Sequence, residues 1–289
     1  AAFYVLLYYF VQILSSFVLL TIAVNRAAKV VGQTSGDEYQ DFVNSFTERY
    51  SDTASIIAGV LCIALCVLVF PLYRRLSGDG SLSAKSFFAL RLPKARHALL
   101  ALAIGAAAYH FVALYLNLCG KLFPSAFESY DNASQSITSE SLVAVNLILL
   151  VIVTPLCEEL IFRNRLIDSF SGAGIGPVFS VLLSSLIFGV AHGNPVWIIY
   201  AFTIGCIFGF MYTSSGSLMT GVIAHAVFNL FGFAYGKLST AEMTEGARSA
   251  VNVFYTVFLY FSPVLLAGLL FLFFGTPFIR RGKKEKKEL

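Results

Sequence analysis

Eight long apolar runs constrain this chain more than any other feature of its sequence. A helix needs about 20 apolar residues to cross the hydrocarbon core of a bilayer, and the runs approach that length. Charged residues make up 12% of the chain, against roughly 25% in soluble domains. We therefore predict an all-α, polytopic membrane protein with about eight transmembrane helices in one integral membrane domain, residues 1–289. The runs cover approximately residues 2–24, 54–72, 98–118, 142–162, 177–192, 195–213, 218–235 and 251–274.

The placement of Lys and Arg predicts the orientation of these spans. Of the 20 Lys and Arg residues, 14 fall in residues 73–97, in the loop near 163–176 and in the last ten residues. Cytoplasmic loops of membrane proteins carry an excess of Lys and Arg. The bias predicts that both termini are cytoplasmic and that residues 275–289 form a basic cytoplasmic tail. No aromatic or Gly-rich recognition module accompanies the tail, so it does not indicate a nucleic-acid partner.

Two adjacent carboxylates follow the apolar part of the fourth run. Glu158 and Glu159 are followed by Arg163, and each charge near the middle of a bilayer costs about 2.5–3.5 kcal/mol on insertion scales. Glu159 and Arg163 are four residues apart with the acid first, which is the favourable order for an ion pair on a helix. Glu158 points about 100° away from Glu159. We therefore predict that Glu158 stays free to act as a general base, the alternative being a structural charge cluster.

Two of the four histidines lie in ordered contexts within apolar runs. His192 ends the fifth run in Phe188-Gly-Val-Ala-His192, and His225 lies in the seventh run with Asn229 four residues later. His225 and Asn229 therefore project from one face of a helix. Hydrogen-bond donors on one face suit the oxyanion that develops when a carbonyl compound is hydrolysed. A single intramembrane histidine is more often a packing residue, and two of them with a free Glu favour a site.

Helical rise predicts which of these groups meet. The spans that carry Glu158 and His192 form a hairpin that turns near Ser171–Gly176, and the two residues differ in height by about 6 Å. We expect them to meet across the hairpin. Gly193 and Pro195 break the helix after His192. His225 lies close to its own turn, near Ser214–Ser217, so it reaches Glu158 only if a helix tilts or if that turn is buried within the membrane.

Three motifs together resemble the CPBP family, which contains CAAX prenyl protease 2 and bacteriocin-processing intramembrane proteases and is also called the Abi family. The family pattern is EExxxR, then FxxxH, then HxxxN on successive helices. This chain has Glu158-Glu159-xxx-Arg163, Phe188-xxx-His192 and His225-xxx-Asn229 in that order. The resemblance covers roughly residues 142–232, which we take as the catalytic core helices.

The resemblance implies an eight-helix bundle with a water-filled cavity and an intramembrane endopeptidase activity. By position, Glu158 and His192 would activate the attacking water, and His225 and Asn229 would stabilise the oxyanion. Glu159 and Arg163 would support that arrangement. Two His and one Glu could also bind a zinc ion, although the spacing is not HExxH. A metal-free mechanism driven by glutamate uses the same residues and is slightly favoured, and the cofactor stays open.

The resemblance also implies a peptide or protein substrate, either lipidated or not, and a protein that works in the bilayer. A prenylated tail, a bacteriocin or signalling-peptide precursor and a membrane-protein segment all remain possible substrates. The size of the chain favours a bacterial cell membrane and therefore peptide processing. Two other functions stay open. A proton-coupled transporter would carry inverted repeats and acids on several helices, neither of which we see, and a non-catalytic scaffold would have lost a motif residue.

Overall fold

The fold is all-α in every part of the chain that can be described. The computed structural model describes residues 2–32, 35–77, 87–135 and 143–275, and regular structure in these ranges is entirely helical. Seven of the described helices are long and apolar enough to cross a membrane. These helices confirm the predicted all-α, multi-pass architecture. They span Phe3–Val30, Asp37–Leu72, Ala95–Leu122, Val143–Gly172, Pro195–Ser215, Leu218–Ser239 and Glu245–Phe274.

The fifth predicted span is shorter than expected, which corrects the count of eight. It forms helix α9 (Pro177–Val190) with 14 residues, so it is about 21 Å long and does not cover a hydrocarbon core of about 30 Å. The predicted break follows it, because Gly193 adopts φ +75° and α10 (Pro195–Ser215) begins at Pro195. The Asn194 side chain accepts a hydrogen bond of 3.0 Å from the backbone N–H of Val196 and so caps α10. His192 therefore lies in the turn after α9, a helix that is too short to cross a full bilayer.

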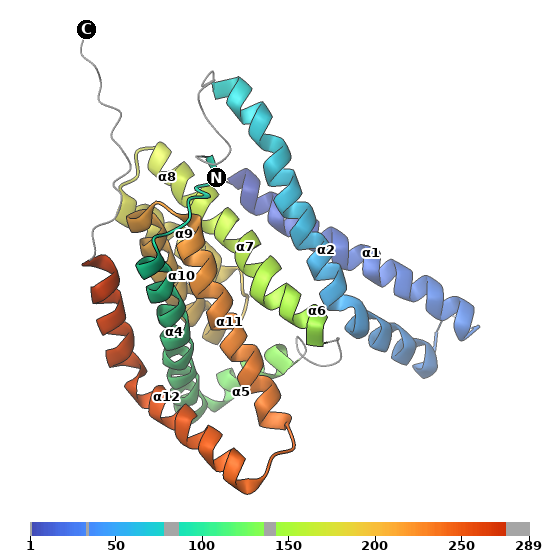
Figure 1. Cartoon of the computed structure of the whole chain (residues 1–289). Coiled ribbons are helices and arrows are strands. Elements are labelled where there is room, and N and C mark those ends of the chain that lie inside the picture. Colours follow the sequence, from blue (N-terminus) through green and yellow to red (C-terminus); the bar gives the residue numbers. More distant parts are fainter. Residues whose placement is uncertain (1, 33–34, 78–86, 136–142, 276–289) are drawn as a thin grey trace.

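Helices α1 (Ala2–Val30) and α2 (Asp37–Ser77) lie side by side and project from the rest of the bundle (Figure 1). The 41-residue α2 begins at Asp37, so much of the stretch between the first two predicted runs, 2–24 and 54–72, belongs to this helix. The other helices are α4 (Ala95–Leu122), α5 (Pro124–Gln135), α11 (Leu218–Thr240) and α12 (Glu245–Phe274). The orientation of the termini stays a prediction, and the tail beyond Gly275 lies outside the described residues.

Residues Val143–Gly172 form one span whose hydrogen bonding changes along its length. The segments are α6 (Val143–Leu147), η1 (Ile148–Val153), α7 (Thr154–Glu158), η2 (Glu159–Ile167) and α8 (Asp168–Gly172). The two η segments are π-helical, a wide geometry that is rare and occurs often at functional sites. This span carries both glutamates, and its packing determines where they point.

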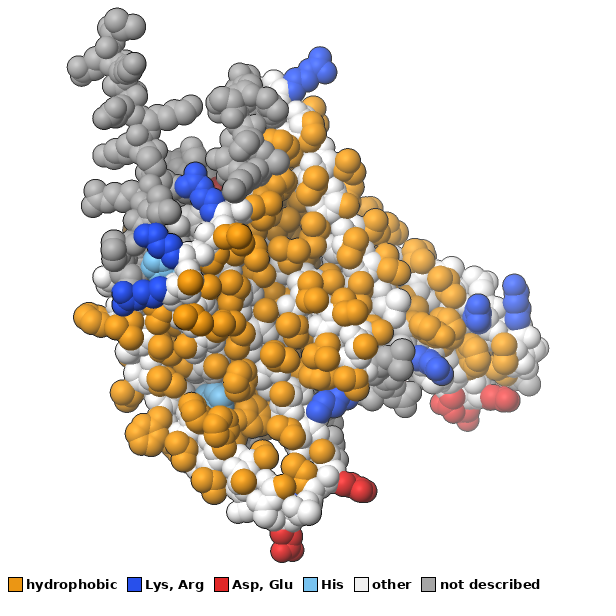
Figure 2. Space-filling view, viewed as in Figure 1, with side chains coloured by type: hydrophobic (Ala, Val, Ile, Leu, Met, Phe, Trp, Pro, Cys, Tyr) orange, Lys and Arg blue, Asp and Glu red, His pale blue; other side chains and the backbone are white. Residues whose placement is uncertain are grey.

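Apolar side chains cover most of the visible surface, as expected for a chain surrounded by lipid. In Figure 2 they are spread over most of the visible face, while the charged side chains lie mainly near its outline. Leu6 and Phe10 on α1 and Val264 and Phe271 on α12 are among the exposed hydrophobic residues. The exposed apolar faces are therefore the faces that the bilayer covers.

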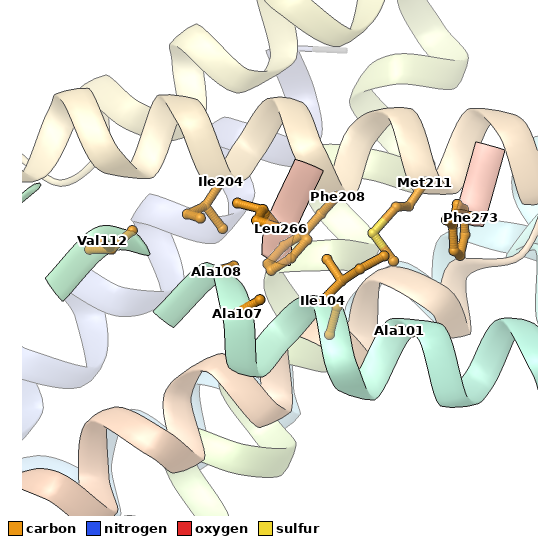
Figure 3. Packing of buried hydrophobic residues seen from close by; sticks show 11 residues of the cluster. Ala101, Ile104, Ala107, Ala108, Val112, Ile204, Phe208, Met211, Leu266 and Phe273 are labelled. Carbon is orange, nitrogen blue, oxygen red and sulfur yellow. The ribbon is translucent and has the colours of Figure 1, made fainter. Parts of the chain in front are cut away.

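Small residues on α4 let the helices of the bundle core pack closely. Ala107 and Ala108 of α4 lie against Phe208 of α10 in a cluster that also contains Leu266 of α12 (Figure 3). A Cβ atom on Gly105 of α4 would collide with the backbone carbonyl of Ala224 in α11. The backbone of α4 therefore directly supports α11, the helix that carries His225.

The turn between α10 and α11 is buried under a segment that precedes α4. The backbone N–H of Leu218 donates a 3.0 Å hydrogen bond to the carbonyl of Ala89, and the Ser217 hydroxyl donates to the carbonyl of Arg91. Ser217 and Leu218 are both buried. Ala89 itself has φ +50°, which is uncommon for a residue other than glycine. The turn before α11 is therefore buried within the protein beneath residues near Ala89, and its depth in a bilayer stays a prediction.

Candidate active site

Two glutamates and one histidine form the centre of a buried polar cluster. His225 Nδ1 lies 3.0 Å from Glu159 Oε1, and His225 Nε2 lies 3.8 Å from Glu158 Oε2. A carboxylate oxygen only accepts hydrogen bonds, so Nδ1 carries the proton that it donates to Glu159. The imidazole thus lies between the two carboxylates. Glu158 keeps 12% of its side-chain exposure and Glu159 keeps none, so Glu158 is the acid that a substrate could reach.

The predicted ion pair between Glu159 and Arg163 is present. Arg163 Nε lies 3.2 Å from Glu159 Oε2, and both side chains are buried. The contact lacks hydrogen-bond alignment, and the guanidinium has no hydrogen-bond partner among the described residues. Its central carbon instead lies 4.3 Å from the centre of the Phe188 ring, a cation–π contact that is favourable when the cation is desolvated. Glu159 is therefore neutralised inside the protein by Arg163.

The wide helical geometry beside Pro155 explains the position of Asn229. The backbone N–H of Thr154 reaches back five residues to the carbonyl of Leu149, so the carbonyl of Leu150 would need a donor at residue 155. Pro155 has no N–H. Asn229 Nδ2 fills this place with a 2.8 Å hydrogen bond to Leu150 O. One of the two amide hydrogens of Asn229 is thus structural, and the other stays available as a donor.

His192 lies near the cluster but does not bond directly to Glu158. Its Nδ1 donates a 2.8 Å hydrogen bond to the carbonyl of Phe188, which leaves a lone pair on Nε2 of the neutral ring. The Phe188 ring contacts the rings of both His192 and His225, at 4.9 and 6.3 Å between centroids. The expected direct meeting of Glu158 and His192 is therefore wrong for the described side chains, because His225 occupies the place beside Glu158.

Gly221 is a site residue that sequence reasoning missed. It lies one helical turn before His225 on α11, and a Cβ atom there would be 2.5 Å from Glu159 Oε2. The absent side chain makes room for the carboxylate. The signal in the sequence is the spacing Gly221-xxx-His225-xxx-Asn229, which places all three residues on one face of the helix.

Replacing Gly221 by Ala should disturb the cluster without changing its charges. The new methyl group would push Glu159 away from His225, and a displacement of about 1 Å can cost on the order of a hundredfold in rate. We expect that loss in the rate of peptide cleavage. Gly268→Ala in α12 is the matched control, since a Cβ atom there meets nothing within 4 Å. Equal activities of the two variants would contradict the role of Gly221.

Tyr8 is a second residue that sequence reasoning missed, and it comes from the first span. Its hydroxyl donates a 3.5 Å hydrogen bond to Glu158 Oε1, and its ring packs edge-on against Phe162 at 6.1 Å. A tyrosine in an apolar run has no sequence signal that separates it from a packing residue. The contact links α1 to the carboxylate that substrate could reach.

Replacing Tyr8 by Phe should lower the turnover number and leave KM unchanged, because the hydroxyl orients Glu158. Loss of one long hydrogen bond to a carboxylate should reduce kcat by about three- to tenfold. Tyr9→Phe is the matched control, since no hydrogen bond of Tyr9 is present among the described residues. A lowered thermal stability with unchanged kcat would show that Tyr8 only packs.

The donor groups do not fit a zinc site in this arrangement. Within the described ranges, no group of three or more His, Cys, Asp or Glu side chains could hold a metal ion. Both nitrogens of His225 face carboxylates, and Glu159 faces Arg163. A bound cation would have to displace these contacts, so we derive no step through a metal.

The fold and the cluster together define a multi-pass membrane protein with a buried pair of glutamates against a histidine. Residues 140–231 match the model of a family described as type II CAAX prenyl endopeptidase Rce1-like. The match covers nearly the same residues as the resemblance to the CPBP family.

One relative of this chain comes from a known organism, but its name states no activity. An uncharacterized protein of Mycoplasma capricolum subsp. capricolum is 33% identical over 103 residues, which are 33% of this chain and 29% of that protein. The match thus spans less than a third of the relative's length. No solved structure matches this chain. The family match does not include α1, the helix that carries Tyr8.

Proposed function

We propose that this chain is an intramembrane endopeptidase in which Glu158 activates water for the hydrolysis of a peptide bond. The observation that carries the proposal is the buried cluster of Glu158, Glu159, Arg163 and His225. Burial of charges is costly even when they are paired, so such a cluster persists where it serves a purpose. The match of residues 140–231 to a peptidase family supports the same reaction.

The charges of the cluster suggest that it holds one mobile proton. Two carboxylates and one guanidinium leave a net charge of −1, and one proton shared between Glu158 and His225 makes the cluster neutral. The 3.8 Å between His225 Nε2 and Glu158 Oε2 allows a small movement of either side chain to transfer that proton. A neutral resting cluster is the state that a low-dielectric interior favours.

In the proposed reaction, a water molecule binds between Glu158 and the Nε2 lone pair of His192. Glu158 takes one proton from the water as its oxygen attacks the carbonyl carbon of the peptide bond. Protonated His225 and the second amide hydrogen of Asn229 donate hydrogen bonds to the oxyanion. The proton on Glu158 then passes to the amide nitrogen, the C–N bond breaks, and a carboxylic acid and an amine leave.

We propose a substrate that reaches the site from the bilayer or its surface. The cluster lies in a span with lipid-facing neighbours, so a membrane-associated peptide or a protein tail suits it. A CAAX-type tail and a bacteriocin or signal-peptide precursor both fit this description. The bilayer is the expected location, as a multi-pass protein of a bacterial cell membrane.

Cleavage of internally quenched peptides by the purified, detergent-solubilised protein tests this function. We expect cleavage of at least one member of a library that contains prenylated and unprenylated peptides, with the products identified by mass spectrometry. A parallel sample with a chelator examines metal dependence, and loss of activity there would require a different mechanism. A folded protein that cleaves no peptide would support the transporter or scaffold function instead.

A further inference from the structure

A cavity of about 720 Å³ lies beside the candidate active site. This volume is within the range of about 300–1,000 Å³ that is typical of ligand pockets. Most of its walls belong to the long helices α4, α10, α11 and α12, and Leu150 of η1 and the short helix α5 complete them. Asn229 and Trp197 line the cavity, and the Trp197 ring lies 5.4 Å from the ring of His192. The cavity therefore borders residues that the proposed function uses.

Helix α5 covers one side of this cavity without being buried itself. Phe127, Tyr130 and Ser134 share one face of the 12-residue helix and line the cavity. None of the described side chains of α5 is fully buried, whereas the neighbouring α4 has buried residues along most of its length. Segments with few buried contacts open at the lowest free-energy cost. Among the walls of the cavity, α5 is therefore the one that moves away most easily.

The junction between α4 and α5 allows such a movement. Helix α4 ends at Leu122 and α5 begins at Pro124, so Phe123 alone joins them. Phe123 has φ −135° and ψ 61°, which is outside helical geometry, and the chain turns sideways there (Figure 1). Hinges consist of a few residues at the ends of elements that absorb changes in φ and ψ. A rotation at Phe123 would move α5 and leave α4 in place.

Two contacts fasten α5 to the residues around His192. Asn194, which follows His192 by two residues, donates a 3.2 Å hydrogen bond from Nδ2 to the Ser129 hydroxyl. The Tyr130 ring packs edge-on against the Trp197 ring, with 5.8 Å between centroids. The hydrogen bond joins exposed groups, which can exchange this bond for bonds to water at little net cost. These contacts can therefore break and form again, and they connect the position of α5 to the turn that carries His192.

We propose that α5 is a lid over the cavity, which rotates away from the His192 turn to admit the peptide and closes over it before the bond is cleaved. In the structure the lid is closed. A closed lid keeps bulk water away from the reacting groups, and through Asn194 it holds the turn that carries His192. The proposal rests on the proposed function, since it places the cleaved bond beside the cavity.

A reversible cross-link between the lid and the turn tests the proposal. Ser129→Cys with Asn194→Cys places two thiols where the hydrogen bond was, and a short bifunctional thiosulfonate reagent joins them until a reductant is added. We expect the cross-linked protein to cleave a quenched peptide at least about tenfold more slowly, because a lid that cannot open prevents turnover. The reductant should restore the rate. A cross-link that is verified by mass spectrometry and leaves the rate unchanged would overturn the proposal.

Ser15→Cys with Ala54→Cys is the matched control. The Ser15 hydroxyl donates a hydrogen bond to the carbonyl of Ala54, so this cross-link joins α1 to α2, and neither residue is among those that line the cavity. We expect its cleavage rate to stay unchanged. Each single-cysteine variant of the lid pair is treated in the same way, which includes any reaction at the five native cysteines. An equal loss of activity in the control pair or in a single variant would contradict the lid.

Trp197 reports on the lid without catalysis. It is the single tryptophan of the chain, it lines the cavity and its ring contacts Tyr130 of the lid. The constant for fluorescence quenching by acrylamide, a water-soluble quencher, should fall when the lid is cross-linked and rise again on reduction. If no peptide is cleaved, the proposed function fails, and this fall would still support the lid. The same quenching constant before and after cross-linking would overturn the lid, whether or not peptides are cleaved.

Discussion

Replacing Glu158 by Gln should reduce peptide cleavage by about a thousandfold or more. An amide cannot take a proton from water, and general-base catalysis contributes on the order of 10²–10⁴-fold in rate. Glutamine keeps the size of the side chain and can still accept the hydrogen bond from Tyr8. The initial cleavage rate of a quenched peptide measures the loss of activity. The thermal unfolding midpoint shows whether the variant is still folded.

Glu38→Gln is the matched control for this experiment, since Glu38 is exposed in the first turn of α2. We expect full activity from that variant and a nearly unchanged unfolding midpoint for Glu158→Gln. Substantial cleavage by a folded Glu158→Gln protein would remove Glu158 from the role of general base and would point to His225 or His192 instead.

Replacing Arg163 by Met should destabilise the protein by about 3–5 kcal/mol, because it leaves a buried carboxylate without its cation. Glu159 is completely buried and its Oε2 atom has no hydrogen-bond partner among the described side chains. Methionine preserves most of the packing against Phe188. Denaturant unfolding in detergent, followed by tryptophan fluorescence of the single Trp197, measures the change in the free energy of unfolding.

The double variant Glu159→Gln with Arg163→Met removes both charges and serves as the control. We expect it to recover much of the lost stability, because no uncompensated charge stays buried. An Arg163→Met protein that is as stable as wild type would mean that His225 alone neutralises Glu159, and the ion pair would then be dispensable for stability.

The sequence predicted the parts of the site that depend on one helix. Glu159 and Arg163 share a span at a spacing that any helix of this kind brings together, and the ion pair is present. Gly193 and Pro195 similarly mark the end of α9 and the start of α10, as the structure confirms. Local geometry decides such features, so residue spacing is sufficient to predict them.

Contacts between helices were harder to predict because distant segments determine them. His225 Nδ1 lies 3.0 Å from Glu159 and His225 Nε2 lies 3.8 Å from Glu158. These contacts join two different spans, so residue spacing along one helix does not predict them. The short α9 and the wide turns around Pro155 also shift the heights that a regular helix would give. Tyr8 and Gly221 matter through the neighbours that the tertiary fold brings to them.

The role of each site residue in catalysis stays a prediction. The geometry favours Glu158 as the base and gives Asn229 a structural bond in addition to its proposed one. His192 retains a free lone pair but lies apart from Glu158. An alanine substitution would affect folding to a different degree at each of these residues. Because Asn229 also makes a structural bond, activity and stability must be measured together for its variants.

The bond between Asn229 and Leu150 has a consequence for how the protein is assembled in the bilayer. The carbonyl that Pro155 leaves without a backbone donor is in the fourth long span, and its partner is 79 residues later in the chain. An unpaired carbonyl in hydrocarbon is costly, so we expect this span to enter the membrane in a different local register. We expect the span to adopt its π-helical segments only after α11 has packed against it. The side chains of the two glutamates would then reach their final orientations late in biogenesis.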